Sequence, residues 1–254
     1  MGTLAIVTAM QQELRALLPV LDEPKRLELA GRTFHAGLIS GRPVVLAQSG
    51  IGKVAAATTT ALLIQACEAE QLVFTGVAGG LGGGVRVGDV VLGRELIQHD
   101  MDASPLFRRF EVPLTGRARF AGDAALTDAL RVAALHCLNH AAEYIGEAHL
   151  TDFGIDSPLV HEGLIASGDR FVATAAESAA LRALLPDVLA VEMEGAAFAQ
   201  VCSDFGRPFA VLRCISDRAD DDAHADFGRF IAEVAAVYTR EVIGAWLRAD
   251  LAGA

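Results

Sequence analysis

Short apolar runs alternate with helical patterns along almost the whole chain, and this alternation restricts the fold more than any other feature. An Ala-rich helix is expected at 54–67, and a capping box beginning at Thr174 indicates another helix that stops at Pro186. Strands that are separated by helices favour a largely parallel sheet with helices on its faces. We therefore predict an α/β fold with strands at 4–8, 44–48, 72–75, 87–92, 164–166, 188–193 and 209–215.

Length and composition indicate one domain. The chain has 254 residues, 52% of them hydrophobic, and α/β folds of this size are commonly undivided. We predict a single domain over 1–254, with a surface excursion at 144–162. The chain closes with an amphipathic helix, whose apolar stripe is Phe227, Phe230, Ile231, Val234, Val237 and Trp246.

The charge excludes several kinds of partner. A net charge of -11 argues against nucleic acid or an anionic membrane, because both bind basic surfaces. We find neither a cationic leader nor a run of the roughly 20 apolar residues that a membrane span needs. The four cysteines form no CxxC pair and lack zinc spacing, so buried, reduced thiols are expected. The sequence predicts a cytoplasmic protein with a small or weakly charged ligand.

Carboxylates follow three of the predicted strands, in the segments 9–13, 191–195 and 213–217. Ligands of open α/β sheets bind beyond the carboxyl ends of the strands, so these acids are expected to form one site. Asp217 is expected to be partly buried, with a raised pKa that makes it a proton donor. Glu13 is expected to stay ionised and to activate water. Strand alternation would place Glu192 and Glu194 on one face, unless the strand ends there.

Two glycine-rich segments need separate interpretations. The segment 50–55 matches the dinucleotide fingerprint GxGxxA, but the next strand, 72–76, ends without the acid that would hold a ribose. We therefore reject a dinucleotide site. The glycines of 50–55 are still expected to let the backbone come close to a ligand. The segment 76–84 either forms a flexible turn or admits a flat ring against its backbone.

The sequence gives little support for a metal site, a catalytic serine or a phosphate-binding P-loop. The acidic run 217–226 lacks the spacing of a calcium loop, and acids before a long helix are expected to cap it. The sequence has neither a GxSxG elbow nor a P-loop. We therefore predict no metal site.

Six segments together resemble the 5′-methylthioadenosine/S-adenosylhomocysteine nucleosidases of the purine nucleoside phosphorylase superfamily. The resemblance spans nearly the whole chain in the family's order. It implies a three-layer α/β sandwich with a mixed, partly closed central sheet flanked by helices. It also implies a homodimer that hydrolyses the bond between adenine N9 and ribose C1′ without a cofactor. The six segments are 9–13, 49–54, 75–80, 167–171, 191–194 and 216–217.

The resemblance assigns expected roles by position. Asp217, beside Ser216, would protonate adenine N7, and Glu13 would activate the attacking water. Glu194 would accept hydrogen bonds from the ribose hydroxyls, and Arg213 would order the carboxylates and water. An oxocarbenium-like transition state needs these contributions, because the leaving base must be protonated while water attacks the opposite face.

The remaining predicted contacts surround the base and the sugar. Phe171 would stack on adenine, the backbone of Val172 would bind its edge, and Phe227 would form a wall. Met10 and Met193 would pack on the sugar. Further predicted substrate contacts are Val77, Ala78, Gly79 and Glu192.

Several alternatives stay open. A phosphorylase would hold phosphate with arginines, but Arg15 lies beyond Glu13 and 49–54 contains none. A hydrolase of another 5′-modified nucleoside, such as futalosine, would keep the same acids, and a non-catalytic protein would tolerate their loss. The segment 100–107 differs from the best-known members, which leaves the 5′ substituent open. The apolar loop 105–113 is expected to close over the neighbouring site of a homodimer.

Overall fold

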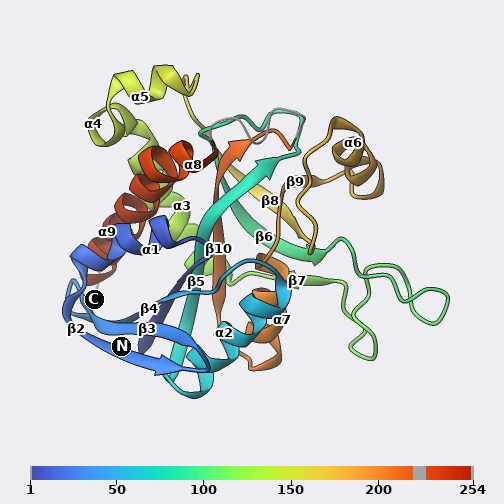
Figure 1. Ribbon diagram of the computed structural model, residues 1–254, viewed down its shortest axis with the longest axis horizontal. Coiled ribbons are helices and arrows are strands. Elements are labelled where there is room, and N and C mark those ends of the chain that lie inside the picture. The colour runs from blue at the N-terminus through green and yellow to red at the C-terminus, as the bar shows by residue number, and fades with distance from the viewer. Residues whose placement is uncertain (1, 220–226, 253–254) are drawn as a thin grey trace.

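The computed structural model describes residues 2–219 and 227–252, and their strands form one mixed sheet (Figure 1). The strand order is β10-β6-β8-β9-β5-β1-β4-β3-β2, and β10 also pairs with β5. Five strands therefore close into a ring, while the others extend from it as an open wing. The strands of the ring are β5 (Ala69–Gly80), β10 (Phe209–Asp217), β6 (Val90–Gln98), β8 (Val160–Ser167) and β9 (Val188–Glu192).

The sheet is mixed, whereas alternation alone predicted a largely parallel sheet. In the ring, β10 pairs antiparallel with β6 and β5 pairs antiparallel with β9. Further antiparallel pairs occur in the wing. It continues from β5 through β1 (Thr3–Thr8), β4 (Arg42–Gln48), β3 (Arg32–Ile39) and β2 (Asp22–Leu29). The last three strands are antiparallel. Ala30–Gly31 and Ser40–Gly41 join them, and all four residues have positive φ, as type I′ hairpin turns require. The prediction missed β2, which is mostly exposed, and β3, in which Phe34 and Ile39 are buried, because neither strand has a continuous run of buried apolar residues.

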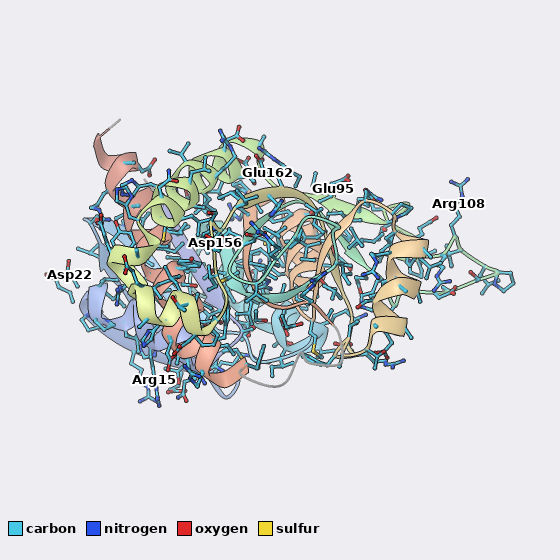
Figure 2. The ribbon with its side chains drawn as sticks, turned by 90° about the horizontal axis from the view of Figure 1, so that it is seen from above. Arg15, Asp22, Glu95, Arg108, Asp156 and Glu162 are labelled. Carbon is cyan, nitrogen blue, oxygen red and sulfur yellow. The ribbon has the colours of Figure 1, made fainter. Side chains whose placement is uncertain are left out.

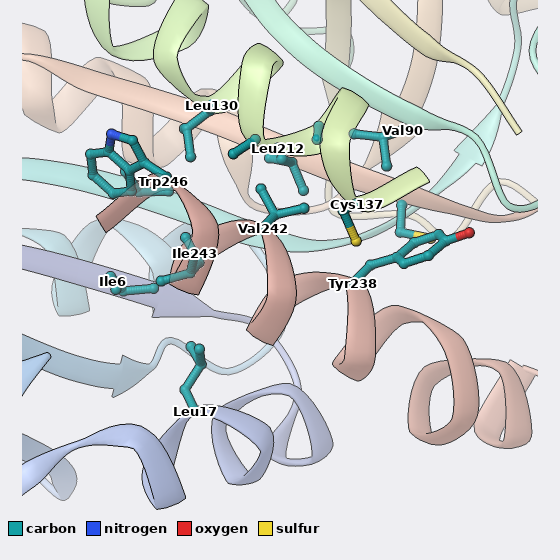
Figure 3. Packing of buried hydrophobic residues seen from close by; sticks show 14 of the residues in the cluster. Ile6, Leu17, Val90, Leu130, Cys137, Leu212, Tyr238, Val242, Ile243 and Trp246 are labelled. Atoms are coloured by element: carbon teal, nitrogen blue, oxygen red, sulfur yellow. The ribbon is translucent and has the colours of Figure 1, made fainter. Parts of the chain in front are cut away.

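Helices cover both faces of the sheet (Figure 1). On one face α1 (Gln11–Leu17) and α3 (Ala124–Asn139) pack on α9 (Ala236–Ala252), and on the other α2 (Lys53–Gln65) packs on α7 (Gly195–Asp204). Figure 3 shows the first interface, where Leu130 of α3 and Trp246 of α9 meet residues of the sheet. The three-layer sandwich with a partly closed sheet is confirmed.

Local capping explains where α6 (Ala175–Leu184) begins. The Thr174 hydroxyl accepts a hydrogen bond from the Glu177 amide at 3.2 Å, and its own hydrogen is donated to the Glu177 carboxylate at 3.0 Å. The helix ends just before Pro186, as predicted. This capping box fixes the chain immediately after Phe171 and Val172.

The prediction of a surface excursion at 144–162 was incomplete. The segment overlaps α4 (Ala141–Ile145) and contains α5 (Glu147–Asp152) and the start of β8. Ile145 and Ile155 are buried in the core. The Phe153 ring packs edge-to-face on Phe230, with centroids 5.4 Å apart. These apolar contacts dock the segment on the helical layer.

The C-terminal helix is interrupted once. It consists of α8 (Phe227–Phe230), a π-helical turn at Ile231–Ala235, and α9. The predicted apolar stripe faces the core, with Phe230 and Trp246 buried. Among the described residues, no helix is both long and apolar enough to cross a bilayer.

One loop departs from the sandwich. Residues 99–118 lead from β6 to β7 (Arg119–Ala121) and project away from the layers, with Arg108 near the tip (Figure 2). Leu106 is 84% exposed and Leu114 is 91% exposed. The loop thus presents large apolar side chains to the outside of a single chain.

Candidate active site

A cavity of about 660 Å³, counted out to its opening, lies at the carboxyl ends of β1, β9 and β10. It contains residues from all three carboxylate-bearing segments of the sequence. Of the predicted acids, Glu192, Glu194 and Asp217 line this cavity directly. The lining residues are Ala9, Met10, Ile51, Val77, Ala78, Gly79, Arg170, Phe171, Val172, Val191, Glu192, Met193, Glu194, Ser216, Asp217 and Phe227.

Asp217, the last residue of β10, lines one side of this cavity with its neighbour Ser216. The Ser216 hydroxyl donates to Oδ2 of Asp217 at 2.7 Å, and the Ala219 amide donates to Oδ1 at 2.8 Å. Gly79 of β5 permits this arrangement, because a Cβ there would lie 2.9 Å from Oδ1 of Asp217. The carboxyl group is therefore buried and oriented by two donors.

Glu13 lies behind the cavity lining, in the first turn of α1. The Met10 amide donates to its Oε2 at 3.1 Å, whereas the buried Oε1 accepts no hydrogen bond within the described residues. Burial raises the pKa of Glu13 to about 7, and the Met10 hydrogen bond and the Arg213 charge oppose that rise. The expectation that Glu13 stays fully ionised was therefore too simple, since this carboxyl titrates near neutrality.

Arg213 also lies behind the lining, on β10, and has no exposed surface. Its guanidinium carbon lies 4.3 Å from the centroid of the Phe74 ring, and its Nη2 donates to Glu192. A Cβ at Gly76 would lie 2.5 Å from Nη1 of Arg213 and 3.3 Å from Oε1 of Glu13. Glycine at this position lets the cation and the carboxyl group occupy the same space beside β5.

Glu192 lies between this arginine and the N-terminus of a helix. It accepts hydrogen bonds from the Glu194 amide at 3.1 Å and the Gly195 amide at 2.8 Å, at the start of α7. Ser167 also donates to Glu192, and it accepts from the Ala196 amide at 2.7 Å. The first turn of α7, Ser167 and Arg213 together fix the orientation of the Glu192 carboxylate.

Glu194 directs its carboxyl group differently. The strand ends at Glu192, so alternation no longer applies and Glu192, Met193 and Glu194 all line the cavity. The Gly52 amide donates to Oε1 of Glu194 at 2.9 Å. Burial raises the pKa of Glu194 to about 7, the nearby Glu192 carboxylate adds to the rise, and Arg213 opposes it.

Aromatic and apolar groups form the rest of the cavity. The rings of Phe171 and Phe227 meet edge-to-face, with centroids 6.2 Å apart. Phe171 is 42% exposed, whereas Val172 is buried. Met10 and Met193 line the same space. The cavity thus combines an aromatic part with a group of carboxylates.

Sequence reasoning missed several residues of the site. Ala9, Ile51, Arg170 and Val191 line the cavity without having been assigned contacts. A polar network beside it was also missed, in which the Lys53 ammonium binds Asp100 at 2.6 Å and the Lys53 amide donates to Asp169 at 2.8 Å. The motif Ser-Gly-Asp at 167–169 was the available signal.

The remaining predictions concern metals and residues beyond the described ranges. No group of three His, Cys, Asp or Glu side chains suited to a metal occurs among the described residues. Asp220, Asp221, Asp222, His224 and Asp226 of the acidic run lie outside them. All four cysteines are free thiols, with Cys67 half-buried and the others buried.

Comparison with known proteins agrees with this geometry. The sequence profile of the phosphorylase superfamily matches residues 3–244. The chain is 38% identical to a 5′-methylthioadenosine/S-adenosylhomocysteine nucleosidase of Glaesserella parasuis, over 96% of this chain and 97% of the relative. This chain belongs to that nucleosidase family. It is an enzyme, a hydrolase of N-glycosidic bonds.

Solved structures are equally similar. The nucleosidase of Neisseria meningitidis in complex with methylthio-immucillin-A has a TM-score of 0.85 and 36% identity, covering 98% of this chain and all of the other. A futalosine hydrolase mutant of Helicobacter pylori has a TM-score of 0.83 and 28% identity, covering 98% of this chain and all of the other. One fold therefore accommodates both kinds of nucleosidase.

Proposed function

We propose that this protein hydrolyses 5′-methylthioadenosine and S-adenosylhomocysteine, releasing adenine and the thioribose product. The observation that carries the proposal is that two buried carboxyl groups, one on the lining and one behind it, belong to the same site. Asp217 lies beside Ser216 on the lining, while Glu13 lies behind the lining with one oxygen that accepts no hydrogen bond within the described residues. Cleavage of an N-glycosidic bond needs such a proton donor and such a base.

The leaving base would bind at the aromatic part of the cavity. Phe171 would stack on adenine, Val172 would contact its edge through the backbone, and Phe227 would close the wall. Asp217 would donate a proton to adenine N7 while the bond between C1′ and N9 breaks. The hydrogen bonds that Asp217 accepts from Ser216 and Ala219 hold its carboxyl group in one orientation, which reduces the entropic cost of that proton transfer.

Water would attack from the side of Glu13. Oε1 of Glu13 would accept the water proton while the water oxygen bonds to C1′. The adjacent Arg213 would orient this water and the carboxylates, because its Nε and Nη1 have no hydrogen-bond partner within the described residues. A pKa of about 7 suits a general base that works near neutral pH.

The sugar would bind against Glu194 and the two methionines. The Gly52 amide anchors Oε1 of Glu194, and Oε2 lies 3.9 Å from Nη2 of Arg213. The remaining acceptor capacity of this carboxyl group would bind the ribose hydroxyl groups. Met10 and Met193 would contact the apolar faces of the ribose and its sulfur substituent. Such contacts orient the sugar as positive charge develops at C1′.

Hydrolysis of futalosine or another 5′-modified nucleoside is the second candidate. The likeness to the Helicobacter pylori futalosine hydrolase supports it, because that enzyme shares the fold across the whole chain. Phosphorolysis has weaker support. Arg170 is the arginine that lines the described cavity, and it pairs with Glu177.

We also propose a cytoplasmic homodimer. The four free thiols fit a reducing compartment. In the dimer, the loop 105–113 would cover the thioalkyl end of the neighbouring site.

A product assay tests the proposed reaction. Purified enzyme is incubated separately with methylthioadenosine, adenosylhomocysteine and futalosine, with and without phosphate, and the sugar product is identified. We expect adenine and free thioribose at the same rate in both buffers. A ribose 1-phosphate product, or turnover of futalosine alone, would contradict the proposal.

A further inference from the structure

A second hollow, of about 1180 Å³ counted out to solvent, lies between α1 and the β2–β3 hairpin. Figure 1 shows these elements at the open wing of the sheet. The hollow shares no lining residue with the proposed substrate cavity, although both border the segment 49–51. Its lining is Gln11, Leu14, Arg15, Leu18, Arg26, Gly31, Arg32, Thr33, His35, Gln48, Ser49 and Gly50.

The charge of this hollow is opposite to that of the protein. Three arginines line it, and no described carboxylate does. Burial and the Arg26 charge lower the pKa of His35, so that ring adds no charge at neutral pH. The whole chain carries a net charge of -11. A concave surface of one sign concentrates the potential of its charges, so this hollow attracts anions that the rest of the molecule repels.

Contacts within the protein leave much of the cationic surface available. The Glu28 carboxylate binds Arg26 at 2.5 Å and accepts from Thr33 at 2.8 Å, so it neutralises one arginine. Arg32 donates through Nε to Thr59 at 2.9 Å and through Nη1 to the Ala30 carbonyl at 3.1 Å. These neutral acceptors orient the guanidinium of Arg32 without cancelling its charge.

Arg15 is the cation that the helix contributes. It lies in the last turn of α1, where a positive charge also interacts favourably with the helix dipole. That interaction explains Arg15 alone. It does not explain why two further arginines and His35 reach the same hollow from the hairpin, which is a different element.

We propose that this hollow binds a small molecule carrying a phosphate or diphosphate group. Planar guanidinium groups match pairs of phosphate oxygens, and several such groups fit a ligand with two or more negative charges. The ring of His35 adds a hydrogen-bonding group at the same place. The proposal does not depend on the hydrolytic activity.

Pyrophosphate is the probe for the first experiment. Isothermal titration calorimetry at low ionic strength is expected to show saturable binding of one pyrophosphate per chain, weakened by added salt. ADP in a parallel titration distinguishes a nucleotide ligand from free phosphate. Binding of either probe that requires the arginines supports the site. No saturable binding of either probe at millimolar concentration would overturn it.

Three variants and one control test whether binding occurs in this hollow. Arg15→Gln is expected to weaken binding by about fivefold or more, because a charge-assisted hydrogen bond is lost. Arg15→Gln combined with Arg32→Gln should abolish it, while Arg32→Lys should keep part of it. Arg182→Gln on α6 removes the same charge from an exposed position outside the hollow and should change nothing.

Thermal unfolding of each variant separates lost binding from lost folding. Arg15 makes no hydrogen bond or ion pair within the described residues, so Arg15→Gln should fold like the wild type. If Arg15→Gln and the double variant bind pyrophosphate as the wild type does, the ligand lies elsewhere and the proposal is wrong.

Discussion

At the scale of single residues, Asp217 carries the proposed proton transfer. Asp217→Asn keeps the shape and the acceptor oxygen of the side chain but removes the acidic proton. We expect turnover of methylthioadenosine to fall on the order of 10²-fold or more, with little change in nucleoside affinity. Steady-state kinetics and equilibrium binding of the same preparation measure both. Turnover near that of the wild type would remove Asp217 from the mechanism.

Glu13 connects activity to pH. Only the ionised carboxylate can accept a proton, so kcat/KM should fall as the pH drops below about 7. Glu194 titrates in the same range, so the observed pKa belongs to both groups. Glu13→Gln should lose most activity, because an amide cannot take a proton from water. A flat pH profile between pH 5 and 8 in the wild type would contradict this assignment.

The same carboxyl group affects stability in the opposite direction. Its pKa of about 7 in the folded protein lies above the ordinary value of 4.5, so protonation stabilises the fold. That stabilisation is complete below about pH 4.5 and is lost as the pH rises through 7. Glu13→Gln should therefore be more stable than the wild type at pH 8, on the order of 1–3 kcal/mol, and equal to it near pH 4. Urea unfolding at both pH values tests this, and an advantage that does not depend on pH would refute it.

Glu194 should discriminate between sugars. A buried acceptor left without its partner costs about 1–3 kcal/mol, so 2′-deoxy analogues should have a lower kcat/KM than their ribose counterparts. Glu194→Ala should reduce that preference. Competition assays with paired substrates measure it directly. If the wild type handles both sugars equally, Glu194 does not bind the 2′-hydroxyl group.

At the scale of elements, the packing of β5 against the end of β10 positions the acid. A Cβ at Gly79 would meet Oδ1 of Asp217 and the Cβ of Ala219, both at 2.9 Å. Gly79→Ala should therefore displace Asp217 and lower kcat by about tenfold or more, since small misplacement of a catalytic group is costly. Gly83→Ala is the matched control, because a Cβ there meets nothing within 4 Å. Equal activity of the two variants would show that β5 does not set the position of Asp217.

At the scale of the whole molecule, the loop at 99–118 is expected to pack against a second copy of the chain. Its exposed apolar residues are expected to be covered in a two-fold dimer. Light scattering should give about twice the chain mass of 26.6 kDa. Phe107→Asp should weaken binding of long 5′ substituents more than binding of adenine. Leu184→Asp on α6 changes an exposed apolar residue outside this loop and serves as the control. A fully active monomer would disprove the arrangement.

The sequence by itself determined the helical and apolar periodicities, the capping box before α6, and the carboxylates that follow β1, β9 and β10. These are local features, because the residues that create them are neighbours in the chain. Apolar strands place their final residues at one edge of the sheet, so the grouping of Glu13, Glu194 and Asp217 was also predictable. The family resemblance added the closure of the sheet, which periodicity does not contain.

Only the tertiary structure decided how these groups are charged and oriented. The β2–β3 hairpin and its basic hollow depend on the pairing of β3 with β4. No apolar run in the sequence predicts that pairing. The pKa of Glu13 depends on burial by several elements and on Arg213, which lies 200 positions away in sequence (213 minus 13). The sequence shows that Gly76 and Gly79 lack a Cβ, but it does not show which side chains need that space. Arg213 and Asp217 of β10 and Glu13 of α1 occupy it. Burial and close approach are properties of the assembled chain, so local sequence cannot specify them.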